Sequence, residues 1–146
     1  MLATPHLLTG AAIASVAPFP LALPLSFASH FILDAIPHWQ ETLKPYKPNF
    51  WTWVRLPVDL ILGVGILLWL ITLKGESVNL LFGALFAILA DLDSIFYIGY
   101  FRRFLQRSLF KPWFKFHEGI QRETKEWWGL LPQIAVVLLS LFIILN

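Results

Sequence analysis

The sequence contains no cysteine and few charged residues. Of its 146 residues only 14% are charged, whereas 58% are hydrophobic. A soluble domain carries about 25% charged residues because its surface must meet water, so this composition predicts a chain that acts at or inside a bilayer. The absence of cysteine excludes a disulfide scaffold, a thiol nucleophile, thiolate metal ligands and a lipoprotein anchor. Chemistry must therefore come from His, Asp, Glu, Ser or Thr.

The basic residues are unevenly distributed. No Lys or Arg precedes Lys44, so the apolar N-terminal segment lacks the basic region of a secretory signal, and we expect it to remain in the mature protein. Lys and Arg concentrate in residues 38–55 and 101–126, whereas the turn at residues 74–77 has only Lys74. Because short cytoplasmic loops are enriched in Lys and Arg, we expect both segments and the N-terminus to be cytoplasmic.

Four long apolar zones are separated by Pro-rich or charged segments. Because about 20 apolar residues cross a bilayer as a helix, they predict an all-α fold, a polytopic integral membrane bundle of four to five helices that forms one domain over residues 1–146. Pro18 and Pro20 divide the first zone into two short helices, neither of which clearly spans alone. The predicted helices cover residues 4–17, 21–37, 53–73, 78–100 and 127–145.

Small residues recur four positions apart in two of these helices. Gly10 precedes Ala14, and Gly83 precedes Ala87, at this spacing. Such pairs let two helix backbones approach closely. We therefore expect these two helix faces to be packing surfaces.

Ionisable residues occur inside the apolar zones, where they are costly. A carboxylate near the bilayer centre costs about 2.5–3.5 kcal/mol on insertion scales, so these side chains must face a shared interior. With the topology above, most of them fall near the cytoplasmic ends of their helices, which predicts one polar pocket that opens to that side. The set comprises all four aspartates and three histidines, namely Asp34, Asp59, Asp91, Asp93, His6, His30 and His38.

The strongest pattern in this set is the spacing of His30, Asp34 and His38. On a regular helix these three residues lie within about 80° of arc, on one face. Imidazole and carboxylate groups on one face are typical ligands of a divalent ion. The alternative is a hydrogen-bonded network between helices without metal. Pro37 can bend the last turn, which would place His38 at the helix end instead.

Four further residues each have two interpretations. Asp91 and Asp93 would lie about 160° apart on a regular helix, so either the helix is broken there or only one of them joins the cluster. Asp59 follows Arg55 by one turn and is either its ion-pair partner or a ligand. His117 lies in a charged segment and is either a solvated histidine or a site residue. We expect His30 and Asp34 to approach Asp91 or Asp93 closely enough to share a ligand.

Residues 101–117 alternate apolar and basic residues at helical spacing. This pattern is typical of an amphipathic helix in the headgroup region, although Pro112 would interrupt it. The segment is either a simple positive-inside loop or a surface that attracts anionic lipid headgroups. Nucleic acid is excluded as a partner because no folded reader domain is present. The basic residues of the expected lipid-binding surface are Arg102, Arg103, Arg107, Lys111 and Lys115.

The polar residues also form short motifs. Residues 6–11 read His-Leu-Leu-Thr-Gly-Ala, residues 30–38 contain His-x-x-x-Asp-x-x-Pro-His, and residues 91–93 read Asp-Leu-Asp. Together, over residues 1–120, they resemble the YdjM-like family, which is described as bacterial inner-membrane metal-dependent hydrolases. Ala90 stands where that family usually has a proline before Asp-x-Asp. Asp59 is added to the ligands that this resemblance implies because it lies inside an apolar zone. The predicted metal ligands are therefore His6, His30, Asp34, His38, Asp59, Asp91, Asp93 and His117.

The resemblance implies a membrane-embedded hydrolase of the bacterial inner membrane. It would use one or more divalent ions, with zinc expected, to cleave a phosphoester or similar bond of a lipid-linked substrate at the cytoplasmic face. Asp34 and Asp93 are the predicted bridging or general-base residues. Two other interpretations stay open: a non-catalytic metal-binding or ion-transporting membrane protein, and a purely structural polar network.

Overall fold

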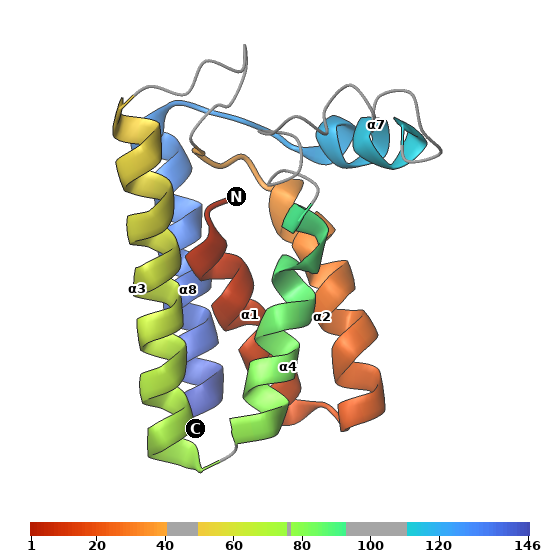
Figure 1. Ribbon diagram of the computed structural model, residues 1–146, viewed down its shortest axis with the longest axis vertical. Helices are drawn as coiled ribbons and strands as arrows, with labels where there is room; N and C mark the ends of the chain where they lie inside the picture. Colours follow the sequence, from red (N-terminus) through yellow and green to blue (C-terminus); the bar gives the residue numbers. More distant parts are fainter. Residues whose placement is uncertain (41–49, 76, 93–110) are drawn as a thin grey trace.

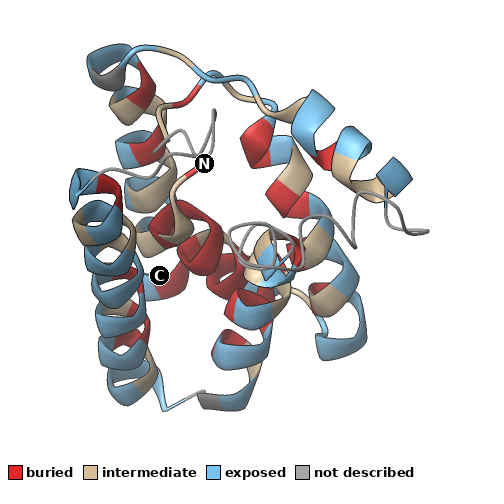
Figure 2. Cartoon of the chain, turned by 45° about the horizontal axis from the view of Figure 1, so that its top comes forward, coloured by how far each residue is buried: buried red, intermediate tan, exposed pale blue. Residues whose placement is uncertain are grey.

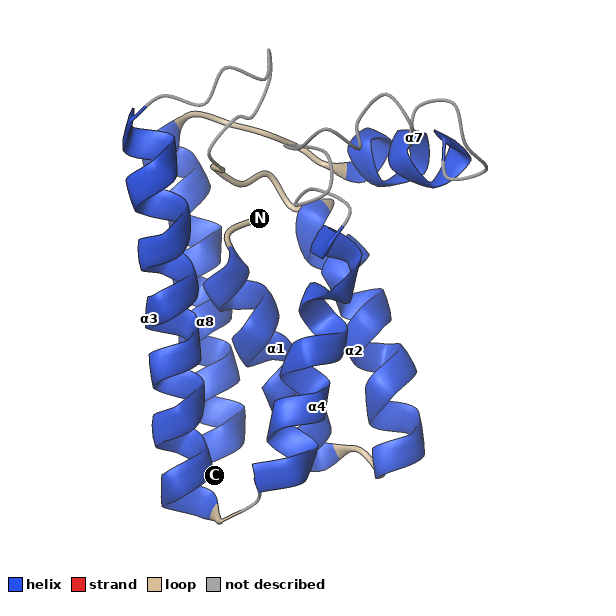
Figure 3. Ribbon diagram, in the orientation of Figure 1, coloured by secondary structure: helices blue, strands red, loops and turns tan. Residues whose placement is uncertain are grey.

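A computed structural model describes residues 1–40, 50–75, 77–92 and 111–146. These residues are helical and contain no strand, as Figure 3 shows, which confirms the all-α prediction for them. The elements are α1 (Ala3–Val16), α2 (Phe19–Asp34), α3 (Phe50–Lys74), α4 (Ser77–Ile88), the short 3₁₀ helix η1 (Leu89–Asp91), α7 (Lys111–Ile120) and α8 (Glu126–Leu145) (Figure 1).

Helix α1 occupies the centre of the bundle. It contacts α2, α3, α4 and α8, and Figure 2 shows the buried residues gathered in the helix that follows the N-terminus. Burying such side chains contributes about 25 cal/mol per Å² of apolar surface. The core residues come from four helices and comprise Leu7, Leu8, Ala11, Ala12, Leu67, Leu70, Leu80, Ala84 and Ile144.

The two small-residue pairs face each other where α1 crosses α4. A Cβ atom added to Gly10 would lie 2.6 Å from the Ala87 Cβ, and one added to Gly83 would lie 2.5 Å from the Ala14 Cβ. Neither position has room for a side chain, because real Cβ atoms do not approach that closely. The prediction that these faces pack closely is confirmed.

Helix α2 ends earlier than the sequence predicted. It begins at Phe19, with Pro20 in the first turn, and ends at Asp34 instead of residue 37. A proline in the first turn is tolerated because its missing N–H has no partner there. Pro37 disfavours helical geometry in the residue before it, so the predicted end of the helix was wrong. His38 therefore lies beyond the helix.

Of the helix predicted over residues 78–100, the structure describes residues 78–92, and α4 ends within this part. Its α-helical part ends at Ile88, and η1 carries the chain on to Asp91, so the helix does change at the Asp91 position. Pro112 lies in the first turn of α7, and residues 101–110 of the predicted amphipathic segment lie outside the described residues. The remaining predicted residues of this region lie outside the described residues, namely Asp93, Arg102, Arg103 and Arg107.

Among the described residues, two helices are long and apolar enough to cross a membrane, Phe50–Lys74 in α3 and Trp127–Leu145 in α8. Only 17% and 22% of their most apolar windows are buried within the bundle. Most of their apolar side chains therefore point outward, in contrast to the core helix of a soluble protein. Helices α1, α2 and α4 have 14, 16 and 12 residues, fewer than the roughly 20 of a typical span.

Candidate metal centre

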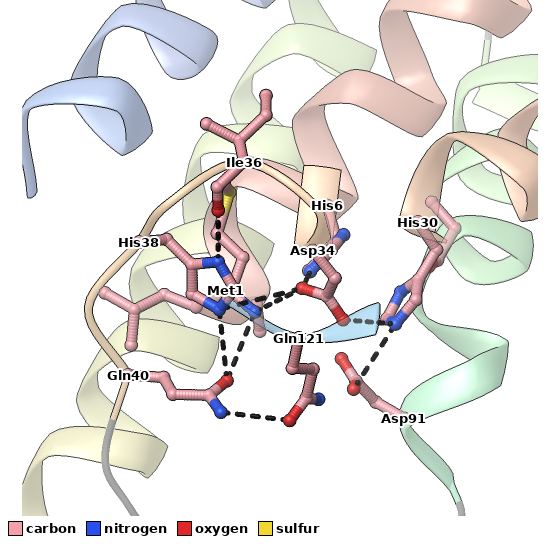
Figure 4. A network of polar contacts seen from close by, with 12 residues as sticks. Met1, His6, His30, Asp34, Ile36, His38, Gln40, Asp91 and Gln121 are labelled. Atoms are coloured by element: carbon pink, nitrogen blue, oxygen red, sulfur yellow. Dashed lines mark hydrogen bonds and ion pairs between the residues drawn. The ribbon is translucent and has the colours of Figure 1, made fainter. Parts of the chain in front are cut away.

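Asp34 lies at the centre of a buried group of histidines near the end of the bundle where α2 stops (Figure 4). Its Oδ1 atom is 3.2 Å from His6 Nε2 and 3.9 Å from His38 Nε2. Its Oδ2 atom is 3.2 Å from His30 Nε2 and 3.4 Å from His117 Nε2. Asp34, His6, His30 and His38 have no exposed side-chain surface. A carboxylate buried at this depth requires positive or polar partners on both oxygens.

The four histidines reach Asp34 from four segments of the chain. His6 comes from α1, His30 from α2 one turn before Asp34, His38 from the segment after α2, and His117 from α7. His30 and Asp34 share a helix face, as their spacing predicted. His38 joins them from outside that helix, because the chain turns back after Asp34.

Two of these histidines have a fixed ring orientation. His30 Nδ1 donates to the carbonyl oxygen of Ala87, at 2.7 Å, and His38 Nδ1 donates to that of Ile36, also at 2.7 Å. A carbonyl oxygen only accepts hydrogen bonds, so both Nδ1 atoms carry a proton, and in the neutral form of each ring the Nε2 lone pair faces the centre. Burial lowers the pKa of His38 from its ordinary value, which favours this neutral, metal-binding form.

Asp91 forms the exposed margin of the centre. Its Oδ1 atom lies 3.6 Å from His30 Nε2, and its side chain is 32% exposed. The predicted approach of His30 to Asp91 is confirmed. Asp91 is thus the carboxylate of the centre that water or a substrate can reach.

His117 is a buried residue of the centre, so its interpretation as a solvated histidine was wrong. Only 3% of it is exposed, and its Nε2 atom lies 3.0 Å from His30 Nε2. Its ring also contacts Phe31 and Trp113, with centroids 5.7 and 6.3 Å away. Aromatic contacts between α2 and α7, such as that of Phe27 with Trp113, hold α7 against the centre.

A short backbone pairing fixes the segment that carries His38. His38 N donates to Arg122 O at 3.0 Å, and Thr124 N donates to His38 O at 2.9 Å. Arg122 N in turn donates to Asp34 O at 3.1 Å. Gly129 of α8 lies directly beneath, because a Cβ there would lie 2.6 Å from the His38 carbonyl carbon. The segment between α7 and α8 therefore holds the ends of the His30 to His38 motif in place.

Asp59 has a different role from either sequence interpretation. Its Oδ2 atom accepts hydrogen bonds from Ala3 N, at 2.6 Å, and Thr4 N, at 3.3 Å. It thereby satisfies N–H groups at the start of α1 that have no partner within that helix. Asp59 is not among the side chains whose ligand atoms cluster. The nearby Arg55 guanidinium lies over the ring of Trp39, 5.6 Å from its centroid.

Two amides near the centre were missed by sequence reasoning. Gln133 is 3% exposed; it accepts a hydrogen bond from Leu2 N at 3.0 Å and donates to Trp39 O at 2.7 Å. Gln40 donates to Glu123 Oε1 at 3.0 Å, and the Met1 amino group contacts both Gln40 and Asp34. In the sequence, Gln133 is an amide within the apolar run of α8, and this is the signal that could have identified it as a buried polar residue.

The donor atoms fit a divalent ion. Two groups have ligand atoms within 4.8 Å of one another, His6 with His30 and Asp34, and His30 with Asp91 and His117. Two atoms bound to one tetrahedral zinc at 2.0–2.1 Å are about 3.3 Å apart, close to the separations above. Neither ring nitrogen of His6 has a hydrogen-bond partner among the described residues, although its Nε2 faces a carboxylate. Imidazole and carboxylate donors suit zinc, manganese and iron.

Comparison with protein-family models, with curated proteins and with solved structures gave no match. The resemblance to the YdjM-like family therefore rests on the motifs alone and stays a prediction.

Proposed function

We propose that this chain is a membrane-embedded, metal-dependent hydrolase that cleaves a phosphoester or similar bond of a lipid-linked substrate. The observation that carries the proposal is Asp34, a fully buried carboxylate with four histidine Nε2 atoms at 3.2–3.9 Å. Structural ion pairs rarely need four imidazoles, whereas metal centres commonly combine several imidazoles with a carboxylate.

A divalent ion bound here would supply a Lewis acid and would activate water for attack near neutral pH. The two carboxylates of the centre would take different roles in the reaction. Both oxygens of Asp34 face histidines, so this residue serves as a ligand more readily than as a base. Asp91 is partly exposed and reaches His30, so Asp91 is the described carboxylate best able to accept a proton from water.

The lipid-linked nature of the substrate is inferred from the surroundings of the centre. Helices α3 and α8 are long and apolar enough to span a bilayer, in a multi-pass arrangement in a bacterial-type inner membrane. Helix α7 lies across the end of the bundle (Figure 1) and has His117 on its buried face and Lys111 and Lys115 on its exposed face. Each such base attracts anionic headgroups by about 1 kcal/mol. Positive-inside orientation puts this end in the cytoplasm.

One observation favours a non-catalytic alternative, in which the chain binds or conducts metal ions. Four residues of the centre are fully buried, and a substrate would reach the described part of the centre at Asp91. A site that stores or conducts metal ions does not need an opening wide enough for a lipid-linked substrate, so this burial is consistent with the alternative.

The deciding experiment measures metal and hydrolysis on the same preparation. The chain purified in detergent is loaded with zinc or manganese and incubated with vesicles that contain phosphatidic acid or phosphatidylglycerol. Release of phosphate or headgroup that falls about 100-fold or more in Asp91→Asn supports the hydrolase. Glu118→Gln makes the same chemical change on the exposed face of α7 and should retain full activity. Bound metal with no hydrolysis of either lipid supports the alternative, and absence of stoichiometric metal overturns both.

A further inference from the structure

We propose that the centre holds two divalent ions and that Asp34 bridges them, one ion on each carboxylate oxygen. This inference rests on the proposed metal-dependent function and specifies how many ions take part and which residues bind each. Its basis is the division of the histidines around Asp34.

The histidines divide evenly between the two carboxylate oxygens. Oδ1 faces His6 and His38, whereas Oδ2 faces His30 and His117. The carboxylate thus presents each oxygen to a separate pair of imidazoles. The Met1 amino group also donates a hydrogen bond to Oδ1.

The rings of His6 and His30 are stacked, which separates their lone pairs. Their centroids are 4.1 Å apart and their planes differ by only 18°. A ring nitrogen directs its lone pair in the plane of its ring, so two nearly parallel rings aim at two neighbouring points and do not converge on one. Both Nε2 atoms nevertheless face Asp34, at 3.2 Å each. A spacing of about 3.5–4 Å is typical of the ions in two-metal sites.

The ligand sets follow from this division. The first ion takes His6, His38 and Asp34 Oδ1. The second takes His30, His117 and Asp34 Oδ2, with Asp91 3.6 Å from His30 as an additional ligand or base. Within the second set, His30 Nε2 and His117 Nε2 lie 3.0 Å apart, near the separation of about 3.3 Å for two atoms on one tetrahedral ion. The Nε2 atom of His6 has no hydrogen-bond partner among the described side chains and lies 3.2 Å from Asp34 Oδ1, where it would bind the first ion.

Two ions at this spacing favour a phosphoester over a carboxylic ester or amide as substrate. A pair of ions can contact both the attacking and the leaving oxygen of an in-line displacement at phosphorus. The bond between phosphorus and the leaving oxygen breaks as water adds, and the proton of that water passes to a base at the open margin, where Asp91 lies. The leaving oxygen takes up a proton from solvent, so the products are an alcohol and a phosphate with one more oxygen.

The test counts ions in the full chain purified in detergent. After equilibrium dialysis against zinc, the unaltered chain should hold two equivalents by elemental analysis. His38→Gln and His117→Gln should each hold one, because each removes a ligand of a different ion. Asp34→Asn should hold none, and Glu118→Gln should retain two. Manganese loading should give the paramagnetic resonance spectrum of an exchange-coupled pair in the unaltered chain, and of an isolated ion in both histidine variants.

The outcomes separate this inference from the proposed function. One equivalent in the unaltered chain, with hydrolysis, overturns the two-ion centre and leaves the hydrolase intact. Two coupled equivalents without hydrolysis support the two-ion centre and overturn the hydrolase, whereas no bound ion overturns both. If Asp34→Asn does not fold, as judged by circular dichroism, the two histidine variants still decide. Loss of both ions in either of them contradicts the division of ligands.

Discussion

The Nδ1 atom of His30 donates a hydrogen bond to the carbonyl oxygen of Ala87, at 2.7 Å, across the interface between α2 and α4. Ala87 also belongs to the face on which α4 packs against Gly10 of α1. The position of a metal ligand and the closest helix packing in the bundle are therefore coupled through one residue.

This coupling predicts that enlarging Gly10 disturbs the metal centre from a distance. Gly10→Val should place its side chain against Gly83 and Ala87, force α4 away from α1, and destabilise the fold by about 1–3 kcal/mol or more. Metal affinity should fall because Ala87 no longer fixes the His30 ring. Thermal unfolding and metal binding of the purified chain measure both effects.

The matched control is Gly65→Ala in α3. Nothing lies within 4 Å of a Cβ at Gly65, so this variant should be unchanged or slightly more stable, because alanine favours helix by up to about 1 kcal/mol. Equal stability and metal affinity of the Gly10 and Gly65 variants would contradict the coupling.

Asp59 should matter for stability and not for metal. Asp59→Ala removes the acceptor for Ala3 N and Thr4 N, which should cost about 0.5–2 kcal/mol, as for other helix caps. Asp59→Asn keeps an acceptor oxygen and should cost less. Both variants should bind as many ions per folded chain as the unaltered protein. A drop in the number of bound ions in Asp59→Asn would restore the interpretation of Asp59 as a ligand.

Gly129 should be intolerant of any side chain. In Gly129→Ala the new methyl group meets the backbone of His38 and Trp39, so we expect a loss of stability of about 1–3 kcal/mol and weaker metal binding through His38. Gly119→Ala in α7, where nothing lies within 4 Å, is the control. Denaturant unfolding and zinc titration of the two variants provide the comparison, and identical behaviour would rule out the close contact.

The metal-free chain should lose stability in mild acid. Burial lowers the pKa of His38 in the folded state, so below an unfolded value of about 6.5 the unfolded chain binds more protons than the folded chain. The contribution of His38 to stability is thus fully present above about pH 6.5 and falls as the pH decreases through that value and toward the folded pKa. His38→Gln should reduce the change in melting temperature between neutral and mildly acidic buffer. An unaltered pH dependence in that variant would exclude His38 as a source of this effect.

The sequence predicted those parts of the centre that depend on local spacing. His30 and Asp34 share a face because they are one turn apart, and the pairing of Gly10 and Ala14 with the α4 face follows from their separation of four residues. The apolar run continues to Pro37 and therefore predicts a helix to that point, whereas the restriction that a proline places on the residue before it predicts an earlier end.

The remaining features arise from contacts between distant segments, which local spacing does not encode. Asp59 caps a helix that begins 56 residues earlier in the chain. His117 becomes buried because aromatic residues of α2 and α7 pack together, and Gln133 joins Leu2 to Trp39 across the bundle. The role of each of these residues depends on contacts that form when the helices assemble.

The pairing between His38 and the segment that follows α7 has a consequence for biosynthesis. Asp34 is held by Arg122 N, and His38 by Arg122 O and Thr124 N, so the geometry around Asp34 and His38 depends on residues that are synthesised after α7. A nascent chain that has not yet emerged through Thr124 contains most of the ligands but lacks the backbone that orders them. The centre therefore completes only after Thr124 has been made, and a chain truncated before that residue holds the residues of a metal site without its geometry.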